Sequence, residues 1–214
     1  MSTVGYANGS NCGACFQMRC TGHPSCKPGI MTVPVTVTNI CPPNAPGGYC
    51  AGNKRSITLP NPVWNQMSKD PSAGVVPVEI KRVRCRRVGG VAFNITGKEY
   101  YVTAPIQCIR ISSKHISIDL TFPSLPRPSP AAMPLNVAGD GAMKRVDISI
   151  ARGPWMTMRK SYGAVWDMPG LPVVGMSLSF RLWPVSGTLP LEAWDAVPAN
   201  WVSNRIYRTA VNFP

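Results

Sequence analysis

The distribution of its eight cysteines constrains the fold of this chain more than any other feature. Seven of them precede residue 90, at positions Cys12, Cys15, Cys20, Cys26, Cys41, Cys50 and Cys85, and only Cys108 follows. They are irregularly spaced among glycine, proline and asparagine. This pattern is typical of disulfides formed in an oxidising compartment, so we expect a first half that is cross-linked and a second half that is not.

A metal site is the alternative interpretation of the Cys-x-x-Cys pair at residues 12–15. Structural zinc needs a second pair of ligands at similarly short spacing. The pairs Cys20 and Cys26, and Cys41 and Cys50, are spaced too widely, and the two histidines lie far apart in the sequence. The sequence therefore predicts disulfides, with no metal and no other cofactor.

The charge of the chain points to a polyanionic partner. The net charge is +13, and such a balance favours nucleic acid, an anionic membrane surface or an acidic polysaccharide. The dense basic run at 81–87 alternates with Val83 and Cys85, which indicates a strand with one solvated face rather than a nucleic-acid patch. No apolar run reaches the roughly 18 residues of a membrane span. No secretory leader is recognisable at Met1, so we expect a truncated or misannotated N-terminus.

Most periodic segments read as short strands. The segments 31–38 and 75–83 alternate with period two, and residues 62–68 form the one expected helix, with Asn61 as N-cap. A boundary falls at Gly89-Gly90. The later expected strands have sandwich-like spacing: 91–96, 99–103, 144–150, 176–182 and 206–212. We predict two β domains, 1–88 and 89–214. Residues 104–134 have no strand alternation and are expected to form a flexible insertion.

Several sequence segments resemble those of the plant expansins, in particular the α-expansin branch. They are NCGACFQMRC, VTVTNICPPN, GGYC, LPNPVWNQMSKDPSAGVVPVEIKRVRCRR, NVAGDGAMKRVDI, GPWMTMRKSYGAVWDM, GMSLSFRL and PANW. The resemblance implies an all-β protein, a double-psi β-barrel related to family-45 glycosidases followed by an immunoglobulin-like β-sandwich. It also implies a secreted, monomeric plant cell-wall protein that needs no cofactor. Such a protein binds cellulose and matrix polysaccharides such as xyloglucan and pectin, and loosens their non-covalent contacts without hydrolysis.

The resemblance also implies a disulfide pairing. Carried over position by position, the pairs are Cys15–Cys85, Cys20–Cys26 and Cys41–Cys50. Cys12 and Cys108 are then left as two odd thiols.

The chain departs from the family in three places. The family's first barrel strand, with one cysteine, has no counterpart before Cys12, so the barrel is expected to be incomplete. Thr58 stands where the family has an acidic residue. Residues 104–134 interrupt a family strand and resemble translated intron. Two alternatives to a wall-loosening protein therefore stay open: a carbohydrate-binding module only, or the inactive product of a faulty gene model.

Hydrolysis of a glycosidic bond needs two carboxyl groups that flank it. The first domain has only Asp70 and Glu79, which we expect to be surface charges, so no catalytic residue is assigned and no enzyme is predicted. Asn39 and Thr58 remain as candidates for binding sugar in the barrel.

Aromatic residues are the binding candidates of the second domain. The resemblance places Trp155, Tyr162 and Trp166 in a planar aromatic row, on which sugar rings could stack. Trp183 and Trp201 are expected in the core instead.

Overall fold

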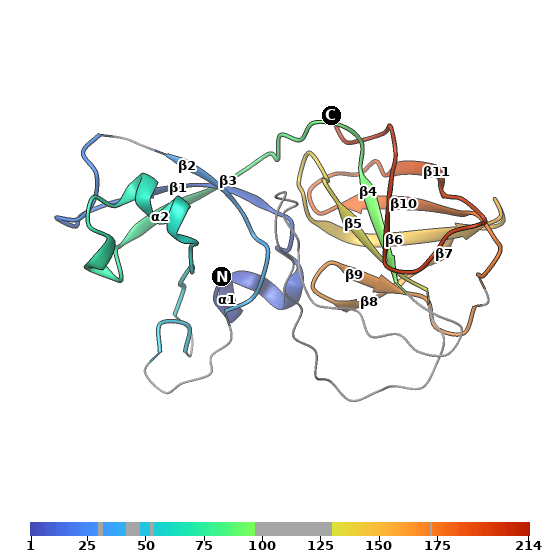
Figure 1. Cartoon of the computed structure of the whole chain (residues 1–214), viewed down its shortest axis with the longest axis horizontal. Coiled ribbons are helices and arrows are strands. Elements are labelled where there is room, and N and C mark those ends of the chain that lie inside the picture. Colours follow the sequence, from blue (N-terminus) through green and yellow to red (C-terminus); the bar gives the residue numbers. More distant parts are fainter. Residues whose placement is uncertain (30–31, 42–47, 52–53, 97–129, 172) are drawn as a thin grey trace.

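The computed structural model describes residues 1–29, 32–41, 48–51, 54–96, 130–171 and 173–214, and these are arranged almost entirely as β-structure (Figure 1). Two short helices accompany the strands, α1 (Thr3–Tyr6) and α2 (Asn61–Met67), with 3-10 turns at Ala7–Gly9 and Pro71–Ala73. The expected helix is present, but Pro60 rather than Asn61 occupies its N-cap position, without a side-chain cap. The expected strand 99–103 and Cys108 lie outside the described residues.

The first half of the chain contributes a three-stranded antiparallel sheet. Its strands are β1 (Cys15–Cys20), β2 (Val33–Thr36) and β3 (Val78–Val83), in the order β2-β1-β3. Successive side chains of a strand face opposite sides. Phe16 and Met18 are accordingly buried on one face while Gln17 is exposed on the other. Helix α2 packs on the buried face through Met67, which shares a core cluster with Met18 and Val33.

The second half forms two sheets that pack face to face. One has the order β11-β10-β6-β7, and the other has the order β12-β4-β5-β9-β8. Their bounds are β4 (Ala92–Thr96), β5 (Ala131–Leu135), β6 (Met143–Ile150), β7 (Met156–Thr157), β8 (Arg159–Tyr162), β9 (Val165–Asp167), β10 (Leu178–Pro184), β11 (Leu191–Val197) and β12 (Arg205–Arg208). Phe93 of β4 and Phe180 of β10 stack across the core, with ring centroids 4.3 Å apart. The result is a β-sandwich, as the strand spacing predicted.

Strand β5 corrects the expected extent of the insertion. The expected insertion, 104–134, includes residues 131–134, yet these belong to a buried strand that pairs with β4 along its whole length. Pro134 argues against a strand in the sequence, because proline cannot donate a hydrogen bond to a neighbouring strand. Strand β9 pairs only with Ala131 and Ala132, so Pro134 lies beyond that ladder and leaves no gap in it. The rest of the insertion, residues 104–129, lies outside the described residues.

Three disulfides link described residues: Cys15–Cys85, Cys20–Cys26 and Cys41–Cys50. These are the pairs that the family resemblance implied. Cys12 is disulfide-bonded as well, so the expectation that it is an odd thiol is wrong. That expectation rests on the family pairing, in which the partner of Cys12 is the cysteine that has no counterpart before it in this chain.

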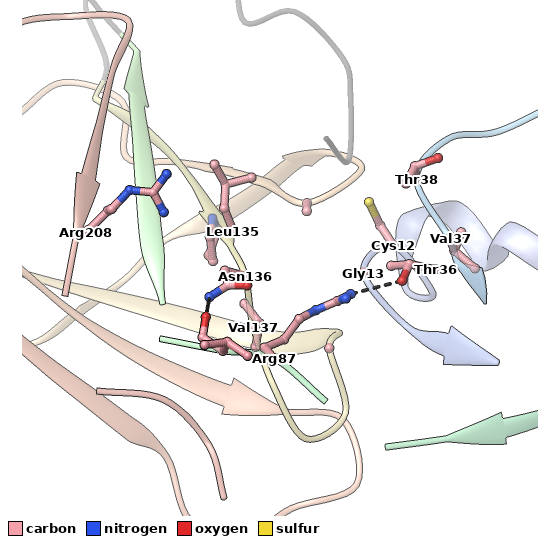
Figure 2. Close-up of a pocket in the computed structure, with 14 residues that line it drawn as sticks. Cys12, Gly13, Thr36, Val37, Thr38, Arg87, Leu135, Asn136, Val137 and Arg208 are labelled. Carbon is pink, nitrogen blue, oxygen red and sulfur yellow. Dashed lines mark hydrogen bonds between the residues drawn. The ribbon is translucent and has the colours of Figure 1, made fainter. Parts of the chain in front are cut away.

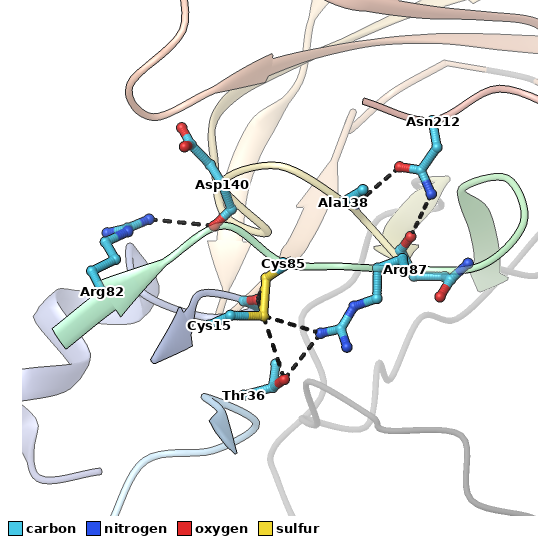
Figure 3. The surroundings of a disulfide bond; sticks show 10 residues. Cys15, Thr36, Arg82, Cys85, Arg87, Ala138, Asp140 and Asn212 are labelled. Carbon is cyan, nitrogen blue, oxygen red and sulfur yellow. Dashed lines mark hydrogen bonds between the residues drawn. A yellow bond between two sulfur atoms is a disulfide. The ribbon is translucent and has the colours of Figure 1, made fainter. Parts of the chain in front are cut away.

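The Cys15–Cys85 disulfide lies where the two halves of the chain meet (Figure 3). The backbone of Cys85 pairs with Gly139 through two hydrogen bonds, of 2.6 and 3.1 Å. Gly13 and Gly141 approach so closely that a Cβ on Gly13 would lie 2.2 Å from the Gly141 carbonyl oxygen. Arg84 donates to the carbonyl oxygen of Pro214. The disulfide therefore fixes Cys85 to β1 within the first half, and a backbone bridge and a contact that only glycine permits hold this half against the sandwich.

Candidate functional site

The aromatic row expected from the sequence is not formed. Trp166 is 4% exposed and belongs to the sandwich core, where it pairs with Ala132 in the five-stranded sheet. Trp155 precedes β7 in the other sheet, so the two rings lie in different layers of the sandwich. Tyr162 ends β8, and its side chain lies outside the described residues. The placement of Trp166 in the row is therefore wrong, because its strand turns the indole inward.

A different set of tryptophans occupies the outer face of the four-stranded sheet. Along β10, Leu178, Phe180 and Leu182 point into the core, so Arg181 and Trp183 point outward. Trp155 and Trp194 meet on the same face, with ring centroids 4.9 Å apart and ring planes at 60°. Trp194 is 47% exposed. We call Trp155, Trp183, Trp194 and Arg181 the tryptophan face. Trp183 was expected in the core, and its outward direction follows from the alternation of β10.

Arg181 stands at the centre of the tryptophan face. Its guanidinium carbon lies 4.7 Å from the centroid of the Trp155 ring and 5.6 Å from that of Trp183. Both distances lie within the range of a cation–π contact. A planar guanidinium between indole rings extends the flat surface that they present.

Below this surface lies the carboxylate of Asp147, on β6, with its side chain 0% exposed. It accepts four hydrogen bonds: from Arg145 Nε at 2.6 Å, Thr157 Oγ1 at 2.9 Å, Trp183 Nε1 at 2.9 Å and Arg181 Nε at 3.1 Å. Burial alone would raise the pKa of Asp147, but the four donors outweigh it and hold the pKa below its ordinary value. The group is therefore a fixed anion under the face.

A second carboxylate completes the arrangement. Glu192 of β11 accepts a hydrogen bond from Trp194 Nε1 at 3.0 Å and lies 3.7 Å from Arg181 Nη1. Arg181 thus stands between two carboxylates, Asp147 and Glu192. Its charge is already balanced within the sheet, and the tryptophan face carries no free cation of its own.

The sugar-binding candidates of the first domain are both exposed but are not brought together. Asn39 Oδ1 accepts a hydrogen bond from the Ile40 backbone amide. The backbone carbonyl oxygen of Asn39 accepts a hydrogen bond from the Met1 amino group. Thr58 Oγ1 lies 3.9 Å from Cys50 Sγ. In the part of the chain that the structure describes, no hydrogen bond joins Asn39 to Thr58.

The two carboxylates of the first domain have structural partners. Asp70 accepts from the backbone amide and the hydroxyl of Ser72, at 2.9 and 2.6 Å, and these hydrogen bonds lower its pKa. Glu79 forms an ion pair with Arg19, which lies opposite it in the β1–β3 ladder. Within the described ranges, no cluster of three or more side chains is suited to bind a metal ion.

A cavity of about 420 Å³ lies at the junction of the two halves (Figure 2). Thr36 and Thr38 line it from the first half, Asn136 and Arg208 line it from the sandwich, and Arg87 lies between. Arg87 Nη2 donates to Thr36 Oγ1 at 3.0 Å. Local sequence patterns do not predict this cavity, because its walls come from segments far apart in the chain.

A cysteine-rich β domain followed by a β-sandwich with an aromatic outer face defines a two-part, all-β class of protein. A family model of the double-psi barrel type, described as lytic transglycolase, matches residues 1–80, and the model of the expansin C-terminal domain matches residues 126–198. Among curated relatives, putative expansin-A30 of Oryza sativa subsp. japonica is 30% identical over the whole chain and 72% of its own length. The chain belongs to the plant expansin family, in its α-expansin branch.

Other relatives agree with this assignment. Expansin-A7 and expansin-A24 of Arabidopsis thaliana are 29% and 31% identical over the whole chain, which spans 71% and 59% of their respective lengths. The apo crystal structure of a Clavibacter michiganensis expansin superposes with a TM-score of 0.60 at 17% identity, and covers all of this chain and 81% of its own. The expected fold class, a double-psi β-barrel domain followed by an immunoglobulin-like sandwich, is confirmed at the level of a barrel-type domain plus an expansin C-terminal domain. No helix among the described residues is long and apolar enough to cross a bilayer.

Proposed function

We propose that the chain is a secreted cell-wall protein that binds cellulose and matrix glycans and loosens their non-covalent contacts without cleaving them. It acts as a monomer, with residues 1–88 as the barrel-type domain and 89–214 as the sandwich. Family membership supports the cell-wall role. The tryptophan face is the observation that carries the binding.

The tryptophan face suits an uncharged glycan. Indole rings pair a large apolar face with a polar edge, and the axial faces of a sugar ring are apolar. Trp155 and Trp194 meet at 4.9 Å, and Arg181 extends the surface toward Trp183. Because Arg181 already bonds to carboxylates, binding here should depend little on salt.

Matrix polyanions such as pectin would be held by a different part of the molecule. Lys81, Arg84 and Arg86 follow one another along and after β3, and all are exposed. Attraction between such exposed charges and a polyuronate is screened as the Debye length falls from about 10 Å at 0.1 M salt to about 3 Å at 1 M. The two kinds of binding can therefore be separated by salt.

The carboxylates of the first domain support the proposed absence of hydrolysis. Asp70 and Glu79 are held by Ser72 and Arg19 rather than presented as a pair. Thr58, at the position of the family acid, cannot donate a proton as a carboxyl group can. This last residue also favours the second candidate function, a carbohydrate-binding protein that no longer loosens walls.

A pull-down on insoluble cellulose in 1 M salt tests the proposal. Trp155→Ala/Trp194→Ala should weaken binding by at least about tenfold, since stacking on aromatic side chains, measured for bases, contributes about 1–3 kcal/mol per ring. Tyr49→Ala is the matched control, because Tyr49 is an aromatic residue of the first domain that is 70% exposed. Full binding by the double variant would refute the assignment of the face.

Wall extension and release of reducing sugar separate the two candidate functions. Binding with extension and without sugar release supports the loosening protein. Binding without extension supports the binding module. Sugar release that Glu79→Gln abolishes would overturn both.

A further inference from the structure

We propose that Asp147 is the positioning residue of the tryptophan face: one buried carboxylate fixes the orientation of rings that it does not itself present to ligand. The inference rests on the proposed function, because it concerns the same face. Asp147 lies in the middle of β6 between Val146 and Ile148, both of which are in the sandwich core. Its side chain therefore points to the outer face, where it is nevertheless fully covered.

The four donors to Asp147 come from three adjacent strands. Arg145 shares β6 with it, Thr157 comes from β7, and Arg181 and Trp183 come from β10. The strand register brings them together, since Asp147 is paired with Arg181 on one side and with Thr157 on the other. A single carboxylate thus joins the side chains of neighbouring strands above the backbone ladder.

Each carboxylate oxygen is fully used. Oδ1 accepts from Arg145 and Thr157, and Oδ2 accepts from Arg181 and Trp183. Every partner donates, so the site needs a group that only accepts. An ionised carboxylate meets that demand, whereas an amide offers one accepting oxygen and an NH2 that also donates. Asparagine at this position would leave two donors facing its NH2.

The position of all three tryptophans depends on this group or on its partner Arg181. Trp183 is held directly through its indole N–H. Trp155 stacks against the Arg181 guanidinium, which Asp147 orients. Trp194 bonds to Glu192, the second carboxylate beside Arg181. Removing the acceptor at Asp147 therefore releases Arg181 and Trp183 together, and with them the support of Trp155.

Asp147→Asn tests the proposal, with Asp195→Asn as the matched control. Asp195 is a carboxylate of β11 that pairs with Arg152 and has no hydrogen bond to a tryptophan. Asp147→Asn should weaken cellulose binding in 1 M salt by about tenfold, whereas Asp195→Asn should bind as the wild type does. The fraction of folded protein is measured by near-UV circular dichroism, so binding is compared per folded molecule.

Two further measurements distinguish positioning from a general loss of structure. In the ¹⁵N spectrum of the ligand-free protein, Asp147→Asn should shift the indole N–H signals of Trp183 and Trp155 and leave that of Trp201 in place. Trp201 donates to the Val173 carbonyl oxygen, away from Asp147. Trp183→Phe keeps a ring but lacks the bond, and should weaken binding on its own. In the double variant Asp147→Asn/Trp183→Phe, the loss of binding free energy should be smaller than the sum of the losses in the two single variants. Both changes break the same contact, so their effects are not additive.

The outcomes separate the inference from the function it rests on. A wild type that does not bind cellulose refutes the proposed function, while the indole shifts still test Asp147. A folded Asp147→Asn that binds as tightly as the wild type, or leaves the two indole signals unmoved, overturns the inference alone. If Asp147→Asn fails to fold, the variants Trp183→Phe and Arg181→Met test the inference in its place. Unchanged cellulose binding by both variants would overturn the positioning role of Asp147.

Discussion

Replacing Cys15 and Cys85 together by alanine should lower the free energy of unfolding by about 4.4 kcal/mol. The disulfide spans 70 residues, and the chain-entropy model converts a loop of that length into this magnitude near 25 °C. Cys20–Cys26 spans 6 residues, for which the same model gives about 2.2 kcal/mol. The second pair is the matched control, because its removal also deletes two sulfur atoms from the first half of the chain.

Urea unfolding at equilibrium, without reductant, measures both losses. Of the two variants, the one without Cys15–Cys85 should also show the steeper decrease of the unfolding free energy with urea concentration. Its unfolded chain is less restricted and exposes more surface. Both cysteines of this disulfide are buried, so lost packing adds to the entropic loss rather than offsetting it. Equal losses for the two pairs, or a larger loss for Cys20–Cys26, would refute the argument from loop length.

Three further predictions concern the sandwich. Trp166→Ala should destabilise the fold by about 3–5 kcal/mol, as other large core truncations do, whereas Trp194→Ala should cost less than about 1 kcal/mol in thermal unfolding and act on cellulose binding instead. The folded pKa of Asp147 is lowered, so its contribution to stability is fully present above the unfolded value of about 3.9 and is lost as the pH falls through the folded value. The stability difference between wild type and Asp147→Asn should therefore shrink in urea titrations below about pH 4, and a constant difference would contradict the assignment. Gly90→Ala would place a Cβ 1.9 Å from the Thr209 carbonyl oxygen, so it should lower the melting temperature, with a loss of roughly 1–3 kcal/mol, and an unchanged melting temperature would show that the backbone yields there.

Much of the fold could be predicted because strand alternation is a local property. The expected strand 75–83 contains β3, and 144–150 differs from β6 by one residue. The signal for β5 was weaker, since AAMPL has no alternation and ends near a proline. A buried strand of small residues reads like a loop until its neighbours are known.

The tryptophan face shows where local patterns stop being sufficient. Alternation along β10 places Trp183 on the opposite face of the strand from the buried Leu182. This local pattern could have predicted that Trp183 lies outside the core. The pairing of Trp155 with Trp194 could not have been found in the same way. It depends on how segments 39 residues apart in the chain are arranged across a sheet, and strand alternation does not reveal that order.

The junction around Cys85 determines how force would pass between the two halves of the chain. Cys85 is bonded through sulfur to β1 and through its backbone to Gly139, so the disulfide and the two hydrogen bonds lie in series between β1 and the sandwich. The same tension acts on both, and the hydrogen bonds are the weaker of the two. A pull on the sandwich would thus open the bridge at Gly139 while Cys85 stays bonded to β1, so the first sheet would keep its strands together as the two halves separate.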